Sequence, residues 1–401
     1  MFSREKICSV PVSRVTFGCS VFVFAFTVTT MLHFRSENFS LNYRRLFVER
    51  PQPRARGGLL PQRRFTHLQP LVDMFANLTQ VTPGRSDCMV STTEFSDLKE
   101  PETKQTILLL IIVSTAPSRQ ERREAIRRTW WTKCHGEVLC KFFTDGLQLT
   151  KESKAMLTNE KLASKDIEFQ PVVGGRSFGL RYLYQMMWAA VKYNFTYFLR
   201  LDDDYFVCLE RLKDELRQRP TKMLSWGWFH CDFKNLIYMD EAWTLFTHDV
   251  VMRLLSQDPQ RILCHPHADQ QIPIWINSVF KKGDNLIHFD DRRLYHYPPA
   301  RTVKKFETLT KVCDSFLGIH GSSPELIQRF WKYSNDHAKK VTVLTDISQT
   351  CNKPLVFDIS IMGKPYKFEL RPCVQNPQWT PGEMMWTGID SGSKKGSVPC
   401  S

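Results

Sequence analysis

Three consecutive aspartates, Asp202, Asp203 and Asp204, directly follow the apolar segment YFLRL at 197–201. Residues two apart in an extended chain face the same side, so Asp202 and Asp204 can converge on one ligand while Asp203 points elsewhere. Carboxylate oxygens suit Mg²⁺ or Mn²⁺, and such ions commonly bridge one or two carboxylates to the phosphates of a substrate. The triplet therefore predicts a divalent-metal site, and nucleotide-sugar chemistry fits it. A solvated acidic turn is the alternative interpretation.

The surroundings of the triplet favour the metal site. Adjacent carboxylates at the end of a buried strand repel one another unless a cation or a basic group neutralises them. No G-x-G-x-x-G follows the first predicted strand, which argues against a Rossmann dehydrogenase, and the sequence has no G-x-x-x-x-G-K-[ST] loop. A metal-dependent phosphohydrolase is compatible with three aspartates, but it would need a denser set of His and Asp ligands than this sequence offers.

The elements that must position the aspartates alternate between strand and helix patterns. Segment 107–115 (ILLLIIVST) is apolar almost throughout, as in a buried strand of a parallel sheet. Ser118 as N-cap and Glu121 as its capping-box partner predict that a helix follows. Further strands are expected at 141–144, 167–173 and 197–201, and further helices at 151–163 and 180–193. This alternation predicts an α/β layered domain with a mainly parallel sheet, whose strands bind ligands beyond their carboxyl ends.

The first part of the chain predicts a membrane anchor. Residues 15–34 are apolar without Asp, Glu, Lys or Arg, long enough to span a bilayer, and more basic residues precede than follow them. This pattern favours a type II signal-anchor over a cleaved signal peptide, whose apolar core is shorter. We therefore expect a cytoplasmic tail (1–14), an anchor (15–34), a flexible stem (35–100), a lumenal catalytic domain (101–345) and a C-terminal extension (346–401) with a β-hairpin.

Charge and cysteine content agree with a lumenal protein. The net charge of +14 suggests anionic partners, and the anchor favours nucleotide phosphates, membrane headgroups or acidic glycans over nucleic acid. Ten of the twelve cysteines follow the anchor without the CxxC spacing of a zinc site, so we expect disulfides. Asn38, Asn77 and Asn194 begin N-glycosylation tripeptides.

Three motifs resemble the β-1,3-glycosyltransferase family, which includes β-1,3-galactosyl- and N-acetylglucosaminyltransferases. Residues 122–130 (RREAIRRTW) are similar to its R-R-x-A-I-R-x-T-W motif, and 200–207 (RLDDDYFV) to its D-x-D motif with a preceding basic residue and a following aromatic. The segment 312–331 is similar to the family's V/L-C…H…PEEM…W ending. The resemblance covers roughly residues 105–335.

The resemblance implies a GT-A fold, Mn²⁺ (or Mg²⁺), a UDP-sugar donor, a glycan or glycoprotein acceptor, inversion at the anomeric carbon and a β-1,3 linkage in the Golgi lumen. Asp204 would be the direct metal ligand and His320 would complete the metal shell, with His296 as the rival histidine. Asp202 would contact either the nucleotide or, through a water molecule, the metal. Asp203 is a second candidate for a nucleotide contact.

Further residues have candidate roles in the transfer reaction. Inversion needs a general base for the acceptor hydroxyl, and Asp269 is the candidate, at the position of the family's acidic pair before an apolar helix. A helix N-cap is its alternative role. Asp290 and Asp291 are the fallback bases. The guanidinium groups of Arg122, Arg123 and Arg127 are candidates for binding the diphosphate or uridine. The aromatic segment 226–230 could stack an acceptor sugar, and packing in the core is its alternative role.

The sequence also departs from the family. Its Gly-rich G-x-G-Y segment is replaced by 238–251 (YMDEAWTLFTHDVV), so Glu241, Ala242 and Trp243 must shape the donor wall differently. Residues 174–179 (GGRSFG) replace the usual D-x-D-S-Y-x-N-L segment.

Galactose is the favoured donor sugar, and N-acetylglucosamine and N-acetylgalactosamine are the alternatives. The competing function is a catalytically weak glycan-binding protein on the same fold. The sequence does not specify the acceptor or the oligomeric state.

Overall fold

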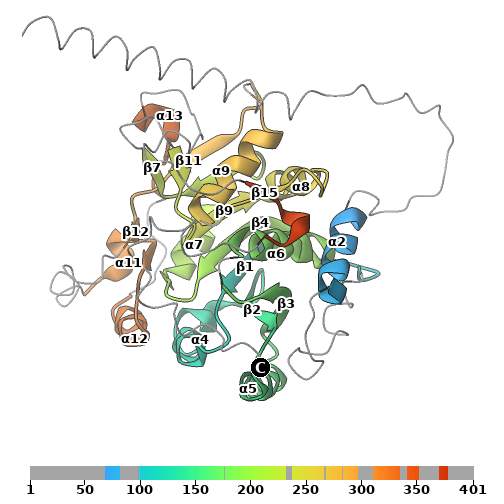
Figure 1. Cartoon of the computed structure of the whole chain (residues 1–401). Helices are drawn as coiled ribbons and strands as arrows, with labels where there is room; N and C mark the ends of the chain where they lie inside the picture. The colour runs from blue at the N-terminus through green and yellow to red at the C-terminus, as the bar shows by residue number, and fades with distance from the viewer. Residues whose placement is uncertain are drawn as a thin grey trace, which may run out of the picture. The chain divides into compact units, whose positions relative to one another are not determined.

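The computed structural model describes residues 68–81, 98, 100–175, 177–231, 237–265, 268–281, 283–296, 310–334, 341–351 and 370–377. The chain divides into two compact units, 1–63 and 64–401, and every described residue belongs to the second. The main feature of this unit is an eight-stranded sheet with the strand order β14-β11-β6-β9-β4-β1-β2-β3 (Figure 1). Its strands are β1 (Gln105–Ser114), β2 (Val138–Leu147), β3 (Ile167–Val173), β4 (Tyr193–Asp202), β6 (Leu224–Gly227), β9 (Trp243–Thr247), β11 (Ile287–Asp290) and β14 (Thr345–Asp346).

Most neighbouring strands of this sheet are parallel. β1 pairs in parallel with both β2 and β4, β2 with β3, and β11 with β6. β9 is inserted antiparallel between β4 and β6, and β14 is antiparallel to β11. The prediction of an α/β domain with a mainly parallel sheet is confirmed, and β4, which carries the aspartates at its end, is a central strand.

Helices cover both faces of the sheet, and each face has its own apolar core. Because successive strand residues face opposite sides, Leu109, Ile111 and Val113 of β1 enter one core and Leu110 and Ile112 the other. The helical elements are α2 (Gln69–Val81), α4 (Gln120–Arg127), η2 (Trp130–Lys133), α5 (Lys151–Ser164), α6 (Phe178–Lys192), α7 (Leu209–Leu216), α8 (His248–Leu255), α9 (Ala268–Val279), α11 (Val312–Ser315), α12 (Pro324–Lys332), α13 (Ile347–Thr350) and η4 (Cys373–Gln375).

Three small sheets complete the described strands. The one beside the aspartates has the order β12-β13-β5 and joins segments far apart in the sequence. These strands are β12 (Leu294–His296), β13 (Gly318–His320) and β5 (Phe206–Val207), and the two other sheets pair β7 (Phe229–Cys231) with β8 (Ile237–Met239) and β10 (Leu263–Cys264) with β15 (Arg371–Pro372).

The predicted capping box before α4 is wrong. The helix begins after Arg119, whose own side chain makes no capping bond. Neither Ser118 nor Glu121 is used as predicted, because the chain turns through a bond from the Arg119 N–H to the Ala116 carbonyl. The guanidinium of Arg119 points instead to Asp203.

The prediction of a flexible stem is also wrong for part of its length, because α2 is a packed helix. Leu71, Met74, Phe75 and Leu78 recur at helical spacing and are buried in the core that contains α6. The ring of Phe75 contacts the ring of Tyr184 edge-on, with centroids 5.1 Å apart. The ordered domain therefore begins before residue 101.

Disulfides are present as predicted: the described residues include the pairs Cys134–Cys140, Cys208–Cys313 and Cys264–Cys373. Asn77 and Asn194 are exposed. The predicted anchor at 15–34, Asn38 and the predicted hairpin at 356–370, apart from its last residue, lie outside the described residues. No helix in the described part of the chain is long and apolar enough to cross a membrane.

Candidate metal centre

The strand β4 delivers the aspartates to the edge of the sheet, and β13 delivers His320 to the same place. After Asp202, the chain turns into β5, which pairs antiparallel with β13. The backbone N–H of Ser322 donates to the carbonyl of Asp204 at 2.8 Å. The ring of Tyr205 stacks on the ring of His320, with centroids 5.7 Å apart and planes within 11°. Backbone pairing therefore brings together two segments that are distant in sequence.

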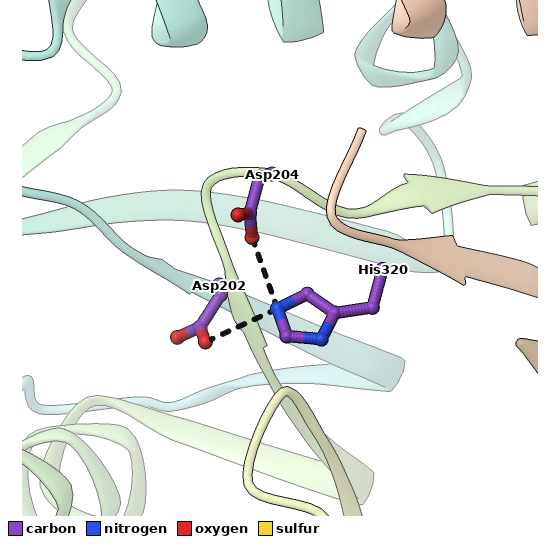
Figure 2. A group of neighbouring side chains, drawn as sticks. All are labelled: Asp202, Asp204 and His320. Carbon is purple, nitrogen blue, oxygen red and sulfur yellow. Dashed lines mark ion pairs between the residues drawn. The ribbon is translucent and has the colours of Figure 1, made fainter. Parts of the chain in front are cut away.

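The three predicted metal ligands form one cluster. Nε2 of His320 lies 3.2 Å from Oδ1 of Asp204 and 3.8 Å from Oδ2 of Asp202 (Figure 2). One ligand atom from each residue lies within 4.8 Å of the other two. The buried Arg200 forms an ion pair with Asp202, and its Nη1 lies 2.7 Å from Oδ1 of Asp202. The side chains are 16% to 28% exposed, so the cluster is open to a ligand.

Charge within the cluster favours a cation between the carboxylates. Burial lowers the pKa of His320, but the hydrogen bond to Asp204 and the charges of Asp204 and Asp202 outweigh this and raise that pKa to about 9. Burial acts to raise the pKa of Asp204, yet His320 and Arg122 hold it well below its ordinary value. Without a metal, the imidazolium therefore supplies the positive charge, and a bound metal ion would replace its proton.

The chemistry of this donor set fits Mn²⁺ or Mg²⁺. Two carboxylates and one imidazole are ligands that these ions accept, and three ligands leave coordination positions for phosphate oxygens and water. The role of Asp202, Asp204 and His320 as metal ligands stays a prediction, supported by their convergence.

Asp203 faces the other way and is fully buried. Its carboxylate accepts hydrogen bonds from Thr115 Oγ1 at 2.7 Å, Arg119 Nη1 at 2.9 Å and Arg122 Nη1 at 3.0 Å. The prediction that Asp203 contacts a nucleotide is therefore wrong, because its oxygens already bind the end of β1 and the helix α4. Asp203 fixes the loop that carries the two ligands.

Of the three predicted phosphate-binding arginines, one lies at the site. The guanidinium of Arg122 is partly exposed, and its Nη1 is 3.1 Å from Oδ2 of Asp204. Arg123 is fully buried and pairs with Glu160, while Arg127 pairs with Glu160 and Asp166. The predictions for Arg123 and Arg127 are wrong because internal carboxylates use both guanidinium groups.

Arg119, which was not among the predicted site residues, also lies at the site. Its side chain is 47% exposed and donates to Asp203 beside Arg122. Spacing gave a signal that could have found it, since residues three apart near a helix start lie on one face and Arg119 precedes Arg122 by one turn.

The predicted general bases have different fates. Asp269 falls in the first turn of α9, and its side chain is outside the described residues. Asp290 and Asp291 are buried: Asp290 accepts from the Phe229 N–H and pairs with Arg292, while Asp291 binds Trp226 and Arg293. The fallback prediction is therefore wrong, since these two carboxylates hold the sheet edge.

The rival histidine, His296, occupies β12 in register with His320 on β13. Its side chain is outside the described residues.

A small aromatic hollow adjoins the metal cluster. It is lined by Tyr205, Trp228, Asp240, Trp243, Leu294, Tyr295 and His320. Within the aromatic segment 226–230, Trp228 lines the hollow, whereas Trp226 is fully buried and packs in the core.

Among the described residues that line this hollow, Asp240 is the one carboxylate, and it was not among the predicted site residues. Its carboxylate accepts from the backbone N–H of Ala242 at 3.0 Å and lies 3.4 Å from Nε2 of His230. No pattern in the sequence singled it out, because a lone aspartate in YMDEAW is typical of an exposed turn.

Comparison with known proteins agrees with the resemblance of the motifs. No family model matches the chain. β-1,3-Galactosyltransferase 6 of Mus musculus is 28% identical over 130 residues, which are 30% of this chain and 40% of that protein. The chain therefore matches two fifths of the length of this curated relative.

The structural similarity of this chain to solved structures is weak. They include the WbbM bifunctional glycosyltransferase (10% identical, 56% of this chain and 47% of that chain, TM-score 0.33), GlyE of Streptococcus pneumoniae TIGR4 (12%, 57% and 60%, 0.33) and the galactosyltransferase LgtC with donor and acceptor sugar analogues (11%, 60% and 99%, 0.32). At these TM-scores the overlaps carry no argument about this chain. The resemblance predicted from the motifs is nevertheless confirmed by the curated relative: the chain is similar to a member of the β-1,3-glycosyltransferase family.

Proposed function

We propose that this chain is an inverting, metal-dependent glycosyltransferase with a GT-A arrangement. It transfers a hexose, with galactose favoured, from a UDP-sugar to a hydroxyl of a glycan or glycoprotein and forms a β-1,3 linkage. The observation that carries the proposal is the convergence of Asp202, Asp204 and His320 beyond the carboxyl end of β4, where ligands bind in open α/β sheets. The similarity to a β-1,3-galactosyltransferase supports the linkage and the sugar.

The donor diphosphate belongs beside this cluster. Asp204 and His320 would hold Mn²⁺ or Mg²⁺ directly, with Asp202 bound directly or through water, and the ion supplies positive charge that stabilises the departing diphosphate. Arg122, which pairs with Asp204, and Arg119, which pairs with the neighbouring Asp203, add two more positive charges near the cluster. Guanidinium groups bind phosphate oxygens in forked geometry, so both can turn part of their donor set to the diphosphate.

The donor hexose, rather than the acceptor sugar predicted for segment 226–230, would lie over the mouth of the aromatic hollow beside His320, because the hollow itself has room for about one water molecule. Trp228 and Tyr295 offer ring faces for the apolar side of a hexose, and Asp240 offers an acceptor for one of its hydroxyls. The hydrogen bond from Ala242 fixes the direction of the Asp240 carboxylate. The hollow takes the place of the glycine-rich wall seen in related motifs, so its side chains select the sugar.

The general base is proposed to be Asp269, in the first turn of α9. The start of this helix is tied down, since Gln271 Nε2 and Trp275 Nε1 both donate to the carbonyl of Leu263, and Gln271 Oε1 accepts from His265. A base on a helix held in this way would take the proton from the attacking acceptor hydroxyl without a movement of the backbone.

The enzyme is proposed to be a single-pass type II protein of the Golgi membrane. The anchor is residues 15–34, which would leave the catalytic unit in the lumen. Three disulfides in the described residues fit an oxidising compartment.

The test is a donor screen with the full chain in detergent. UDP release is measured with Mn²⁺ and a panel of UDP-sugars, with and without glycan acceptors. Release that depends on an acceptor and on one UDP-hexose supports the proposal, and linkage analysis of the product checks the β-1,3 bond. Glycan binding without release would make the chain a binding protein, and attack on simple phosphate esters would make it a hydrolase.

A further inference from the structure

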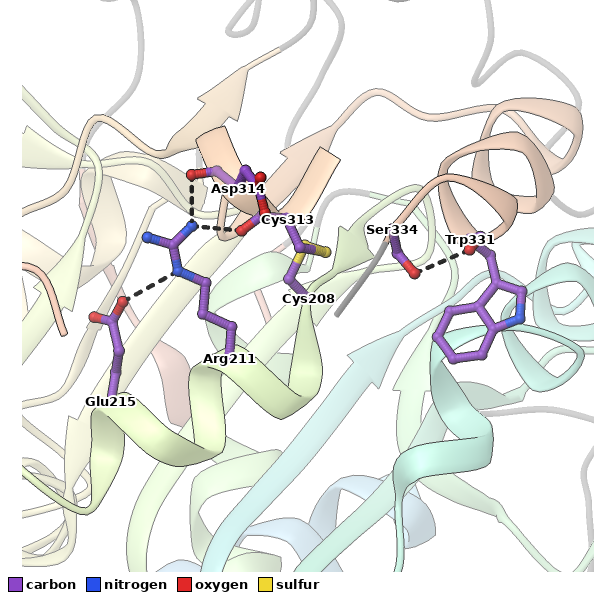
Figure 3. Close-up of a disulfide and its surroundings, with 7 residues drawn as sticks. All are labelled: Cys208, Arg211, Glu215, Cys313, Asp314, Trp331 and Ser334. Carbon is purple, nitrogen blue, oxygen red and sulfur yellow. Dashed lines mark hydrogen bonds and ion pairs between the residues drawn. A yellow bond between two sulfur atoms is a disulfide. The ribbon is translucent and has the colours of Figure 1, made fainter. Parts of the chain in front are cut away.

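The disulfide Cys208–Cys313 joins the two segments that build the candidate metal centre. Cys208 directly follows β5, on the aspartate side, and Cys313 lies in α11, which precedes the strand that ends in His320 (Figure 3). Both cysteines are fully or almost fully buried. The bond therefore links Asp204 to His320 by a short covalent path in addition to the backbone contacts.

The backbone pairing at this point is short. β5 and β13 share only two paired positions, Val207 with Gly318 and Phe206 with Ile319, and the Cys208 N–H extends them by one bond to the Leu317 carbonyl at 3.0 Å. A slip of one residue in a strand turns every side chain to the opposite face. Such a slip would turn His320 away from Asp204, so the register of β13 decides whether the ligand set exists.

A buried arginine reinforces the same point. Arg211, in the first turn of α7 after Cys208, donates through Nη1 to the carbonyls of Cys313 at 2.5 Å and Asp314 at 3.1 Å (Figure 3). Its Nε lies 3.4 Å from Glu215. The helix α7, whose N-cap is Cys208, thus holds α11 through one covalent bond and two hydrogen bonds.

We infer that the Cys208–Cys313 disulfide and the hydrogen bonds of Arg211 to the same segment together form a positioning element for the candidate metal centre. It fixes the register of β13, so that His320 meets Asp204, and the affinity for a divalent cation depends on it. The inference rests on the proposed function, because it assumes that the cluster binds a metal.

The chain contains a matched control. Cys264–Cys373 closes a sequence separation of 109 residues, against 105 for Cys208–Cys313, and its cysteines are equally buried. Since the loop entropy removed from the unfolded chain depends on loop length, the two bonds constrain the unfolded state to the same extent. Cys208 and Cys313 lie in the same core as Tyr205 and Phe206, which follow the aspartates, whereas Cys264 and Cys373 lie in the core on the other face of the sheet.

The experiment compares two double variants of the full chain, C208A/C313A and C264A/C373A, by calorimetric Mn²⁺ titration and thermal unfolding. We expect both variants to lose thermal stability. Only C208A/C313A should bind Mn²⁺ more weakly, by about tenfold to a hundredfold, which is the usual effect of removing a group that holds metal ligands in place. Equal Mn²⁺ affinity in the two folded variants overturns the inference.

A second variant covers the case in which C208A/C313A does not fold. R211Q keeps the disulfide but removes the guanidinium that donates to Cys313 and Asp314. We expect it to weaken Mn²⁺ binding by a smaller factor in the same direction, and unchanged affinity in R211Q overturns the inference. Absence of Mn²⁺ binding by the unsubstituted chain would instead overturn the proposed function.

Discussion

Nε2 of His320 lies 3.2 Å from Oδ1 of Asp204, and the backbone N–H of Ser322 donates to the carbonyl of Asp204 at 2.8 Å. The two segments that carry these residues are therefore tied through both side chain and main chain. A ligand pair held in this way loses little entropy when a metal ion binds, because its geometry is set beforehand. The same arrangement keeps a positive charge between two carboxylates in the metal-free protein.

The first prediction concerns Asp204. Replacement by asparagine keeps the size of the side chain but removes the negative charge that would bind the metal. Loss of metal stabilisation worth several kcal/mol lowers the transfer rate by on the order of a hundredfold or more. Acceptor-dependent UDP release at saturating Mn²⁺ measures the rate. The control is Asp214→Asn, an acid paired with Arg217 on the surface of α7, and normal rates in both variants would contradict the assignment.

The second prediction concerns Asp203, which we assign to stability. Its buried carboxylate accepts three side-chain hydrogen bonds, and Asp203→Ala leaves Thr115 without that acceptor. Arg119 and Arg122 are partly exposed and can turn to water, so we expect a loss of about 2 kcal/mol. Denaturant unfolding measures it, with Asp214→Ala as the control. Unchanged stability would show that these bonds contribute nothing net.

Much of the fold could be predicted from the sequence because its signals are local. The apolar segment at 107–115 and the strand that precedes Asp202 predict buried parallel strands, and both are central in the sheet. The position of the aspartates beyond a carboxyl end follows from the fold class alone. Their partner His320 was found through the resemblance of its motif, since neither periodicity nor spacing links it to Asp204.

The rest could not be predicted because it depends on contacts between distant segments. Arg122, Arg123 and Arg127 are equivalent in a motif, and only the fold shows that Glu160 and Asp166 use two of them. The helix α2 was hidden by the polar composition around it, although Leu71, Met74, Phe75 and Leu78 have helical spacing.

The third prediction concerns α2. A truncated protein that begins at residue 96 lacks this helix and exposes the surface of α6 that it covers. Each buried apolar side chain of α2 contributes roughly 1.5–3 kcal/mol, so the truncated protein should be aggregated or strongly destabilised. A protein that begins at residue 64 retains the helix and serves as the control. Gel filtration and thermal unfolding compare the two, and equal behaviour would show that α2 is dispensable.

The fourth prediction concerns the aromatic hollow. Trp228→Ala removes a ring face, and Asp240→Asn replaces an acceptor-only group with one that also donates. We expect each to raise KM for the UDP-hexose about tenfold, equivalent to about 1.4 kcal/mol, with Mn²⁺ affinity retained. The control is Trp331→Ala, a partly buried tryptophan of α12 that does not line the hollow. If KM does not change, the sugar binds elsewhere.

The last prediction concerns the buried histidine of β11, His288, whose ring contacts that of Phe229 edge-on. Burial lowers the pKa of His288 from 6.5 to about 4, although Asp346 acts to raise it. Between pH 6.5 and pH 4 this histidine binds more protons in the unfolded chain than in the folded protein. The contribution of His288 to the free energy of unfolding is therefore fully present above pH 6.5, and it falls by about 3 kcal/mol as the pH decreases to 4. His288→Gln should flatten this slope in denaturant titrations, whereas replacing the exposed His135 by Gln should leave it unchanged. A wild-type slope in His288→Gln would assign the acid sensitivity to other groups.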